Sequence, residues 1–332
     1  MTAGLPEGWT LAASAFNWTP DVIRAERGAI ALAAAIPASG LASVIEIELG
    51  QTLRSYPDPD AAELDTLRSA LGTAGGRISI IGISLDDWRH DGAGWKRRDE
   101  DERLAFLAAQ LRAAHRLHAS GVRLPIGQAG PALLERARPL LEEFDLVLYE
   151  EVQGHQTPQN PAHAEAYEAI ARLDDPRIRL LVDISMLMPA LPASYLALLR
   201  DAGVPASFVD ALTDDWRDPA TNDAVVGLLR SGQVPPHVHT AFMNLLIRFG
   251  RSDAADLRDV LPLVGAFHLK FWDLDDADAR VSQPIRNLGA LLREAGWQGT
   301  LTSEWGGHEW LDDDATETTR AHLALAREAL AG

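Results

Sequence analysis

The chain has 332 residues, a formal net charge of −18 and no cysteine. Without cysteine it can form neither disulfides nor thiolate metal sites, so oxygen atoms and imidazole nitrogens must hold any metal ion. Such an acidic chain lacks the clustered Lys and Arg that nucleic-acid binding requires, which favours a neutral small-molecule substrate. The first residues lack a signal-peptide pattern and no apolar run reaches about 18 residues, so we expect a cytoplasmic protein that does not enter a membrane.

Short apolar strands alternate with helices over the first part of the chain. In chain order we expect strand 9–16, helix 21–36, strand 43–49, helix 61–71, strand 77–85, a loop at 86–88, helix 100–120, strand 122–126, helix 131–144, strand 146–151, helix 161–173 and strand 178–183. Strict alternation of this kind is typical of parallel βαβ units.

The seventh strand comes late. Helical patterns precede it at 193–201, 218–231, 237–249 and 254–261, and strand 264–271, helix 284–294, strand 300–304 and helix 315–331 follow. We interpret residues 185–263 as an expanded connection that covers the barrel mouth or forms an interface. The sequence therefore predicts one α/β domain over 1–332, a (β/α)8 TIM barrel with a helical insertion after strand six.

Four of the later strands end in side chains that can bind a metal. These are Glu150 and Glu151, Asp183, His268 followed by Lys270, and Glu304. TIM barrels carry their active sites at the C-terminal ends of the strands, so these residues are expected to share one site. Carboxylate oxygens with one imidazole suit Mn²⁺ best, with Mg²⁺ or Co²⁺ as alternatives. The competing interpretation is that each acid caps a helix or faces solvent.

Two motifs resemble a known family. His268-Leu269-Lys270 with Asp273, and Ser303-Glu304-Trp305-Gly306-Gly307-His308, are similar to motifs of the xylose isomerase-like TIM barrels, which include sugar isomerases and epimerases. In that family, strands five to eight supply Glu, Asp, His and Glu to one divalent ion. The resemblance implies the set Glu151, Asp183, His268 and Glu304.

The choice of Glu151 over Glu150 rests on the residues that follow. Val152-Gln153-Gly154 resembles the Glu-x-polar-Gly turn of the family. The chain departs from the family at two places: Met186 and Gln153 stand where a histidine is often found.

The departures affect the expected proton transfer. The resemblance implies a two-carboxylate mechanism, here through Glu151 and Glu304, and the departures at Met186 and Gln153 argue against its ordinary form. We expect Lys270 to polarise a carbonyl. Because the two family histidines are absent, we expect His155 or His239 to carry the proton, with His308 as a further alternative.

A metal site of this kind stabilises the enediolate formed when a proton next to a sugar carbonyl is removed. We therefore expect a sugar isomerase or epimerase. The first alternative is a lyase, because the resemblance includes the catalytic subunits of C-glycoside deglycosidases, which act on 3-oxo-glycosides with Mn²⁺. A non-catalytic barrel and an abasic-site endonuclease are further alternatives, and the acidic charge argues against the endonuclease.

The chain shows no nucleotide-binding motif. We expect it to form a homo-oligomer or to bind a partner subunit.

Four tryptophans, Trp18, Trp88, Trp272 and Trp305, follow predicted strands. Their rings could stack on a sugar or pack against one another at the barrel mouth.

Overall fold

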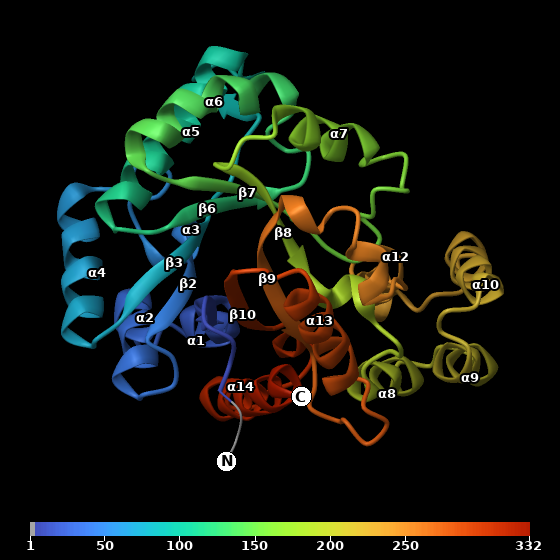
Figure 1. Cartoon of the computed structure of the whole chain (residues 1–332). Helices are drawn as coiled ribbons and strands as arrows, with labels where there is room; N and C mark the ends of the chain where they lie inside the picture. Colours follow the sequence, from blue (N-terminus) through green and yellow to red (C-terminus); the bar gives the residue numbers. More distant parts are fainter. Residues whose placement is uncertain (1–3) are drawn as a thin grey trace.

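The computed structural model describes residues 4–332. Eight parallel strands close into a barrel, with helices around it (Figure 1). In barrel order the strands are β1 (Trp9–Ser14), β10 (Gly299–Trp305), β9 (Val264–Phe271), β8 (Ile178–Asp183), β7 (Val147–Val152), β6 (Gly121–Pro125), β3 (Arg77–Gly82) and β2 (Val44–Glu48). The predicted TIM barrel is confirmed.

Most helices of the barrel layer lie where the sequence predicts them. They are α4 (Ala61–Thr73), α5 (Glu100–Arg116), α6 (Pro131–Phe144), α7 (Ala164–Leu173), α13 (Ser282–Glu294) and α14 (Ala315–Ala331). The short α3 (Leu49–Thr52) after β2 is unexpected. The expected helix 21–36 is wrong as a single element, since α1 (Thr19–Arg24) ends before α2 (Ala29–Ala38) begins. Ala25 between them has a left-handed φ of 56°, through which a right-handed helix cannot continue.

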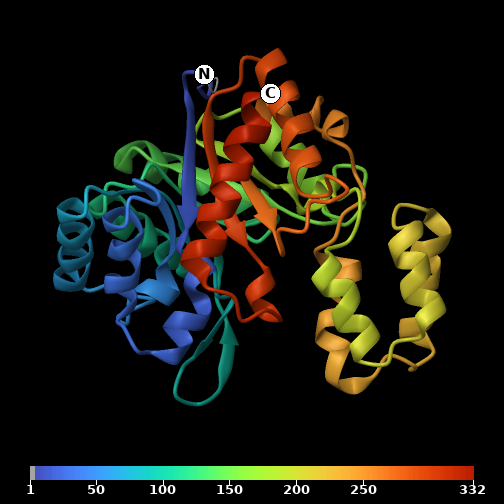
Figure 2. The same ribbon diagram turned by 90° about the horizontal axis from the view of Figure 1, so that it is seen from below.

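The loop expected at 86–88 continues into a hairpin. β4 (Trp88–His90) pairs antiparallel with β5 (Trp95–Arg97), and the Asp91 side chain closes the turn by accepting from the backbone N–H groups of Ala93 and Gly94. In Figure 2 this hairpin extends past the barrel in the direction in which the strands point. Arg89 pairs with Glu102 of α5 at 2.7 Å on one face of the hairpin, and Trp88 and Trp95 on the other face are exposed.

The insertion between β8 and β9 has its own buried core. It contains α8 (Ala193–Asp201), α9 (Ala206–Asp214), α10 (Pro219–Arg230), α11 (His239–Phe242), α12 (Asn244–Ile247) and short 3-10 turns. The helix expected at 237–249 is broken into short pieces, and α9 is unexpected. Tyr195, Phe242 and Phe249 form a cluster with Trp272 of the barrel side, and the α8–α10 helices stand away from the barrel in Figure 2.

Glycines fix the insertion to the barrel. Gly250 donates its N–H to the carbonyl of Ser185 at 2.7 Å, and a Cβ on Gly250 would lie 2.5 Å from both Gly154 O and Met186 Cα. Gly154 has φ 53°, and a Cβ there would lie 2.1 Å from Ile247 O. The loops after β7 and β8 therefore touch the insertion backbone directly.

The interior of the barrel determines which residues reach its mouth. Ile80, Tyr149, Leu181 and Ala266 form an inner cluster. Successive side chains of a strand point to opposite faces, so residues two further along also point inward. For three of these strands, the next inward residues are Glu151, Asp183 and His268.

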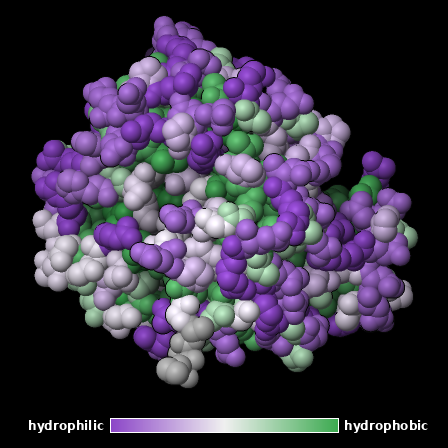
Figure 3. Space-filling view, viewed as in Figure 1, coloured by the Kyte–Doolittle hydropathy of each residue, from purple (hydrophilic) through white to green (hydrophobic). Residues whose placement is uncertain are grey.

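Packing accounts for three of the four candidate tryptophans. Trp18, Trp272 and Trp305 are buried, whereas Trp88 on the hairpin is 51% exposed and its neighbour Trp95 is 71% exposed. The face in view in Figure 3 is mostly hydrophilic, as the net charge leads one to expect. Within residues 4–332, no helix combines the length and apolar character needed to span a membrane.

Candidate metal centre

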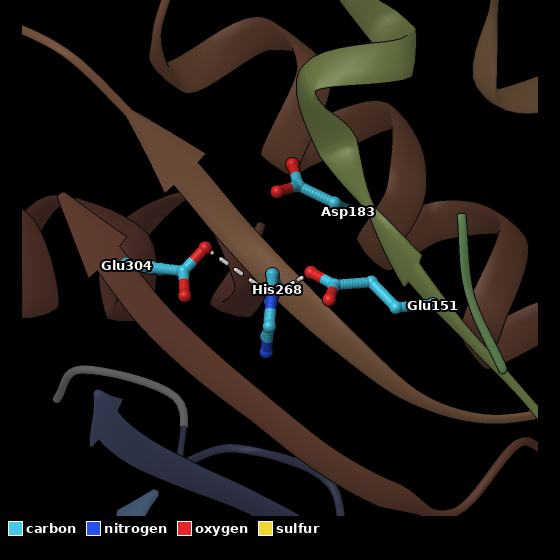
Figure 4. A group of neighbouring side chains, drawn as sticks. All are labelled: Glu151, Asp183, His268 and Glu304. Atoms are coloured by element: carbon cyan, nitrogen blue, oxygen red, sulfur yellow. Dashed lines mark ion pairs between the residues drawn. The ribbon is translucent and has the colours of Figure 1, made fainter. Parts of the chain in front are cut away.

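Four side chains from four neighbouring strands converge inside the barrel (Figure 4). Glu151 (β7), Asp183 (β8), His268 (β9) and Glu304 (β10) are all buried, and each offers a ligand atom within 4.8 Å of the others. His268 pairs directly with Asp183 in the strand register. The structure thus brings together the four residues that the sequence selects, in a group compact enough for one ion to touch each member.

His268 presents its two nitrogens to different partners. Nε2 lies 3.0 and 3.1 Å from the two oxygens of Glu46 on β2, while Nδ1 lies 3.1 Å from Glu151 Oε1 and 3.3 Å from Glu304 Oε2. An Nε2–H that donates to Glu46 leaves the Nδ1 lone pair directed at the other carboxylates. A metal-binding histidine usually donates its other ring N–H to a carboxylate or carbonyl, which fixes the tautomer and the orientation of the ring.

Two buried atoms of the group lack a hydrogen-bond partner. They are Asp183 Oδ2 and His268 Nδ1, while the other oxygen of Asp183 accepts from the N–H of Ser185 at 2.7 Å. A buried polar atom without a partner is costly, so such atoms call for a missing partner. A divalent cation fits both atoms, and three carboxylates with one imidazole suit a hard or borderline ion.

The charges of the site favour a cation. Burial alone would lower the pKa of His268, but the carboxylates of Glu304 and Glu46 outweigh it and hold that pKa well above its usual range. Burial raises the pKa of Asp183 to about 6, although Lys270 opposes this shift. The His268 ring would therefore hold its extra proton at neutral pH and Asp183 would gain one in mildly acidic solution, and a metal ion would displace both protons.

The other two carboxylates remain ionised. Burial would raise the pKa of Glu304, but His268 and Lys270 bring it well below its usual range. Burial also opposes ionisation of Glu151, and Arg123 is the largest of the charges that lower its pKa. Lys270 Nζ lies 2.9 Å from Glu304 Oε2. Burial would lower the pKa of Lys270, but Glu304 and Asp183 outweigh it and raise that pKa, so the ammonium group stays charged.

Sequence reasoning missed three charged residues of the mouth. Arg123 on β6 donates to Glu46 and Glu48 of β2 and to Glu151 Oε2 at 2.8 Å, and it lies 3.8 Å from Glu304. Glu46 and Glu48 stand two residues apart in the apolar strand β2, and Arg123 interrupts the apolar strand β6. The same signal that selects Glu151 was present in the sequence.

Glu150 points away from the barrel interior. Its Oε2 accepts from the N–H of Gly127 at 2.9 Å, and burial raises its pKa to about 7. The structure therefore places Glu151, the residue chosen from the sequence, in the group and leaves Glu150 outside it.

The candidate proton carriers lie elsewhere. His155 is half-buried against the insertion, where its Nε2 lies 3.4 Å from Leu245 O and 3.1 Å from an Arg251 nitrogen, and burial lowers its pKa. His239 is exposed at the start of α11. His308 packs beside Phe16 with ring centroids 4.8 Å apart. Among the described residues, no hydrogen bond or ion pair joins these three histidines to the four-residue group.

Relatives with curated names align over most of the chain. The C-glycoside deglycosidase alpha subunit of Arthrobacter globiformis is 29% identical over 306 residues, which cover 89% of this chain and 85% of the relative. The 3'-dehydrocarminate deglycosidase alpha subunit of a Microbacterium species is 26% identical over 287 residues, 81% of this chain and 80% of the relative. A C-glycoside deglycosidase alpha subunit of Microbacterium trichothecenolyticum is 22% identical over 317 residues, 87% of this chain and 84% of the relative. No family model matches the chain.

Solved structures of similar fold include sugar epimerases. The 3-keto-D-glucoside 4-epimerase of E. coli superposes with a TM-score of 0.54 at 14% identity and covers 96% of this chain and 99% of its own. The D-psicose 3-epimerase of Clostridium cellulolyticum H10 superposes with a TM-score of 0.57 at 11% identity and covers 97% of this chain and 99% of its own. A third structure, the IOLI protein with a bound zinc atom, has a TM-score of 0.53 at 13% identity, covering 97% of this chain and 98% of its own. These structures share the TIM-barrel fold that the sequence predicts, and the named relatives and epimerases are enzymes, as expected for this chain.

Proposed function

We propose that this chain is a divalent-metal-dependent lyase that removes the proton beside the carbonyl of a 3-oxo-glycoside and then expels the aglycone. The observation that carries the proposal is the buried group of Glu151, Asp183, His268 and Glu304 with Lys270 beside it. The deglycosidase names of the relatives support the lyase, which the sequence alone ranked behind an isomerase or epimerase.

The four residues of the group would hold the ion, with Mn²⁺ as our first choice. A bound divalent ion would supply positive charge to a substrate oxygen and so make the neighbouring C–H bond more acidic. Lys270 would face negative charge that develops on the substrate carbonyl, since its ammonium group is 2.9 Å from Glu304 at the same mouth.

The carboxylates of the group serve better as ligands than as bases. Their depressed pKa values make Glu151 and Glu304 weak proton acceptors, so we assign them to holding the ion. His155 and His239 stay predictions as proton carriers, and each would have to reach the substrate from its place on or against the insertion.

A sugar epimerase is the second candidate. It shares the removal of the proton beside the carbonyl, and a site that removes this proton can also return it to the opposite face of the sugar carbon.

The names of the relatives as alpha subunits support a further proposal, that the chain works with a partner subunit.

The test uses the metal-stripped protein reloaded with Mn²⁺ and a 3-oxo aryl C-glucoside as the probe. We expect release of the aglycone, measured by liquid chromatography, and deuterium uptake at the carbon beside the carbonyl in D₂O. Asp183→Ala should do neither. A new sugar epimer without release of aglycone would support the epimerase instead. Metal-loaded protein that shows neither release, epimer nor exchange on the probe would overturn both.

A further inference from the structure

One carboxylate of the barrel mouth belongs neither to the metal group nor to the support of His268. Glu48 is the last residue of β2 and faces inward, two positions after Glu46. Its side chain is 25% exposed, compared with 9% for Glu151 and 5% for Glu304. Glu48 is therefore the most accessible acid of this charged mouth.

The fold gives the Glu48 carboxylate a defined place. Glu48 pairs in register with Gly82 of β3, and a Cβ on Gly82 would lie 2.1 Å from Glu48 Oε2. Any residue other than glycine at 82 would thus collide with the carboxylate where it now sits. The missing side chain of Gly82 thus leaves the space that the Glu48 carboxylate occupies, so the fold fixes the position of this carboxylate.

Arg123 holds this carboxylate by one oxygen only. Its guanidinium donates to Glu48 Oε1, and it also contacts Glu46 and Glu151. In the described part of the chain, no hydrogen bond to Glu48 Oε2 is found, and this oxygen is not among the enclosed polar atoms without a partner. One oxygen is thus anchored and the other is free to meet a molecule at the mouth.

Burial and the neighbouring charges bring the pKa of the Glu48 carboxyl group close to neutral pH. Burial raises the pKa of Glu48 to about 7; Arg123 opposes the shift, and Glu46, Glu304 and Glu151 reinforce it. The two carboxylates of the metal group are shifted the other way. Proton transfer is most efficient when the pKa of the catalytic group lies near the working pH.

We propose that Glu48 is the residue that moves the proton in the reaction proposed above, on which this inference rests. The Glu48 carboxylate takes the proton from the carbon beside the carbonyl, and the C–H electron pair passes into the enolate. That pair then forms a carbon–carbon double bond as the bond to the aglycone breaks. The protonated Glu48 then gives a proton to the aglycone, so the carboxylate is regenerated and no proton is gained or lost.

The decisive variant is Glu48→Gln, which keeps the shape and removes the base. The variant should bind Mn²⁺ as the wild type does, because over the described range 4–332 no hydrogen bond or ion pair joins Glu48 to Glu151, Asp183, His268 or Glu304. With the 3-oxo aryl C-glucoside, we expect kcat to fall at least about 100-fold, as for loss of a general base, while KM changes little. The wild-type rate should fall as the pH drops below the pKa of Glu48, and Glu48→Gln should lose this dependence.

Two further variants make the result interpretable. Glu143→Gln changes an exposed acid outside the barrel in the same way and should leave kcat unchanged. Gly82→Ala should lower kcat without lowering Mn²⁺ binding, since the added Cβ displaces the Glu48 carboxylate. Glu48→Gln that binds Mn²⁺ and retains more than half of the wild-type kcat overturns the role of Glu48 alone. Wild-type protein that is inactive on the probe overturns the proposed function, and this inference with it.

Discussion

Replacement of Glu46 by Gln tests whether His268 binds a metal through Nδ1. Glu46 is fully buried, and its Oε1 accepts from both Arg123 Nε and His268 Nε2. The amide oxygen of Gln can take the place of Oε1, so Glu46→Gln removes the charge behind the ring and keeps the shape. Loss of such a support costs about 10–100-fold in metal affinity, or about 1.4–2.7 kcal/mol.

The affinity can be measured by competition with a coloured chelator, starting from metal-stripped protein. We expect the dissociation constant for Mn²⁺ to rise by this factor in Glu46→Gln, and to be unchanged in the exposed control Glu143→Gln. Circular dichroism and the thermal midpoint establish that both variants are folded. A folded Glu46→Gln that binds Mn²⁺ as tightly as the wild type would refute the assignment of Nδ1 as the ligand atom.

Three further outcomes follow from the site and its surroundings. Glu304→Ala and Asp183→Ala should each lose most of the bound metal in elemental analysis, and full occupancy in both would contradict the ligand set. Burial lowers the pKa of His322 from 6.5 to about 3, so the unfolded chain binds the extra proton between these values. Stability should therefore fall by about 1.4 kcal/mol for each pH unit below 6.5, and urea unfolding of His322→Gln should lack this contribution. Trp95→Ser should change the free energy of unfolding by less than about 0.5 kcal/mol, because the ring is exposed, and a larger loss would show that it packs on the protein.

The sequence predicts the barrel well where strands are uninterrupted apolar runs. Residues 264–271 and 178–183 are strands with the predicted bounds, because a strand buried on both faces leaves a clear apolar signal. The hairpin at 88–97 carries no such signal. Its strands have three residues each and an exposed face, so neither apolar alternation nor length marks them.

The site is predictable only in part. Asp183 and Glu304 stand at or near strand ends and can be found one strand at a time. Arg123 and Glu46 also interrupt apolar strands, but their contacts with each other and with His268 form only once the barrel closes and brings β2 and β6 across from β9. The position of His155 depends on its contact with Leu245 of the insertion, a tertiary contact that the local sequence does not predict either.

The contact between Gly250 and the loops after β7 and β8 makes the insertion and the metal group mechanically coupled. The carbonyl of Ser185 that accepts from Gly250 is two residues after Asp183, and Gly154 is three residues after Glu151. Since no side chain separates the three backbones, a displacement of the insertion at Gly250 cannot be absorbed by a rotamer change. A force applied to the insertion from outside, for example by a bound subunit, would pass through the backbone to the positions of Glu151 and Asp183.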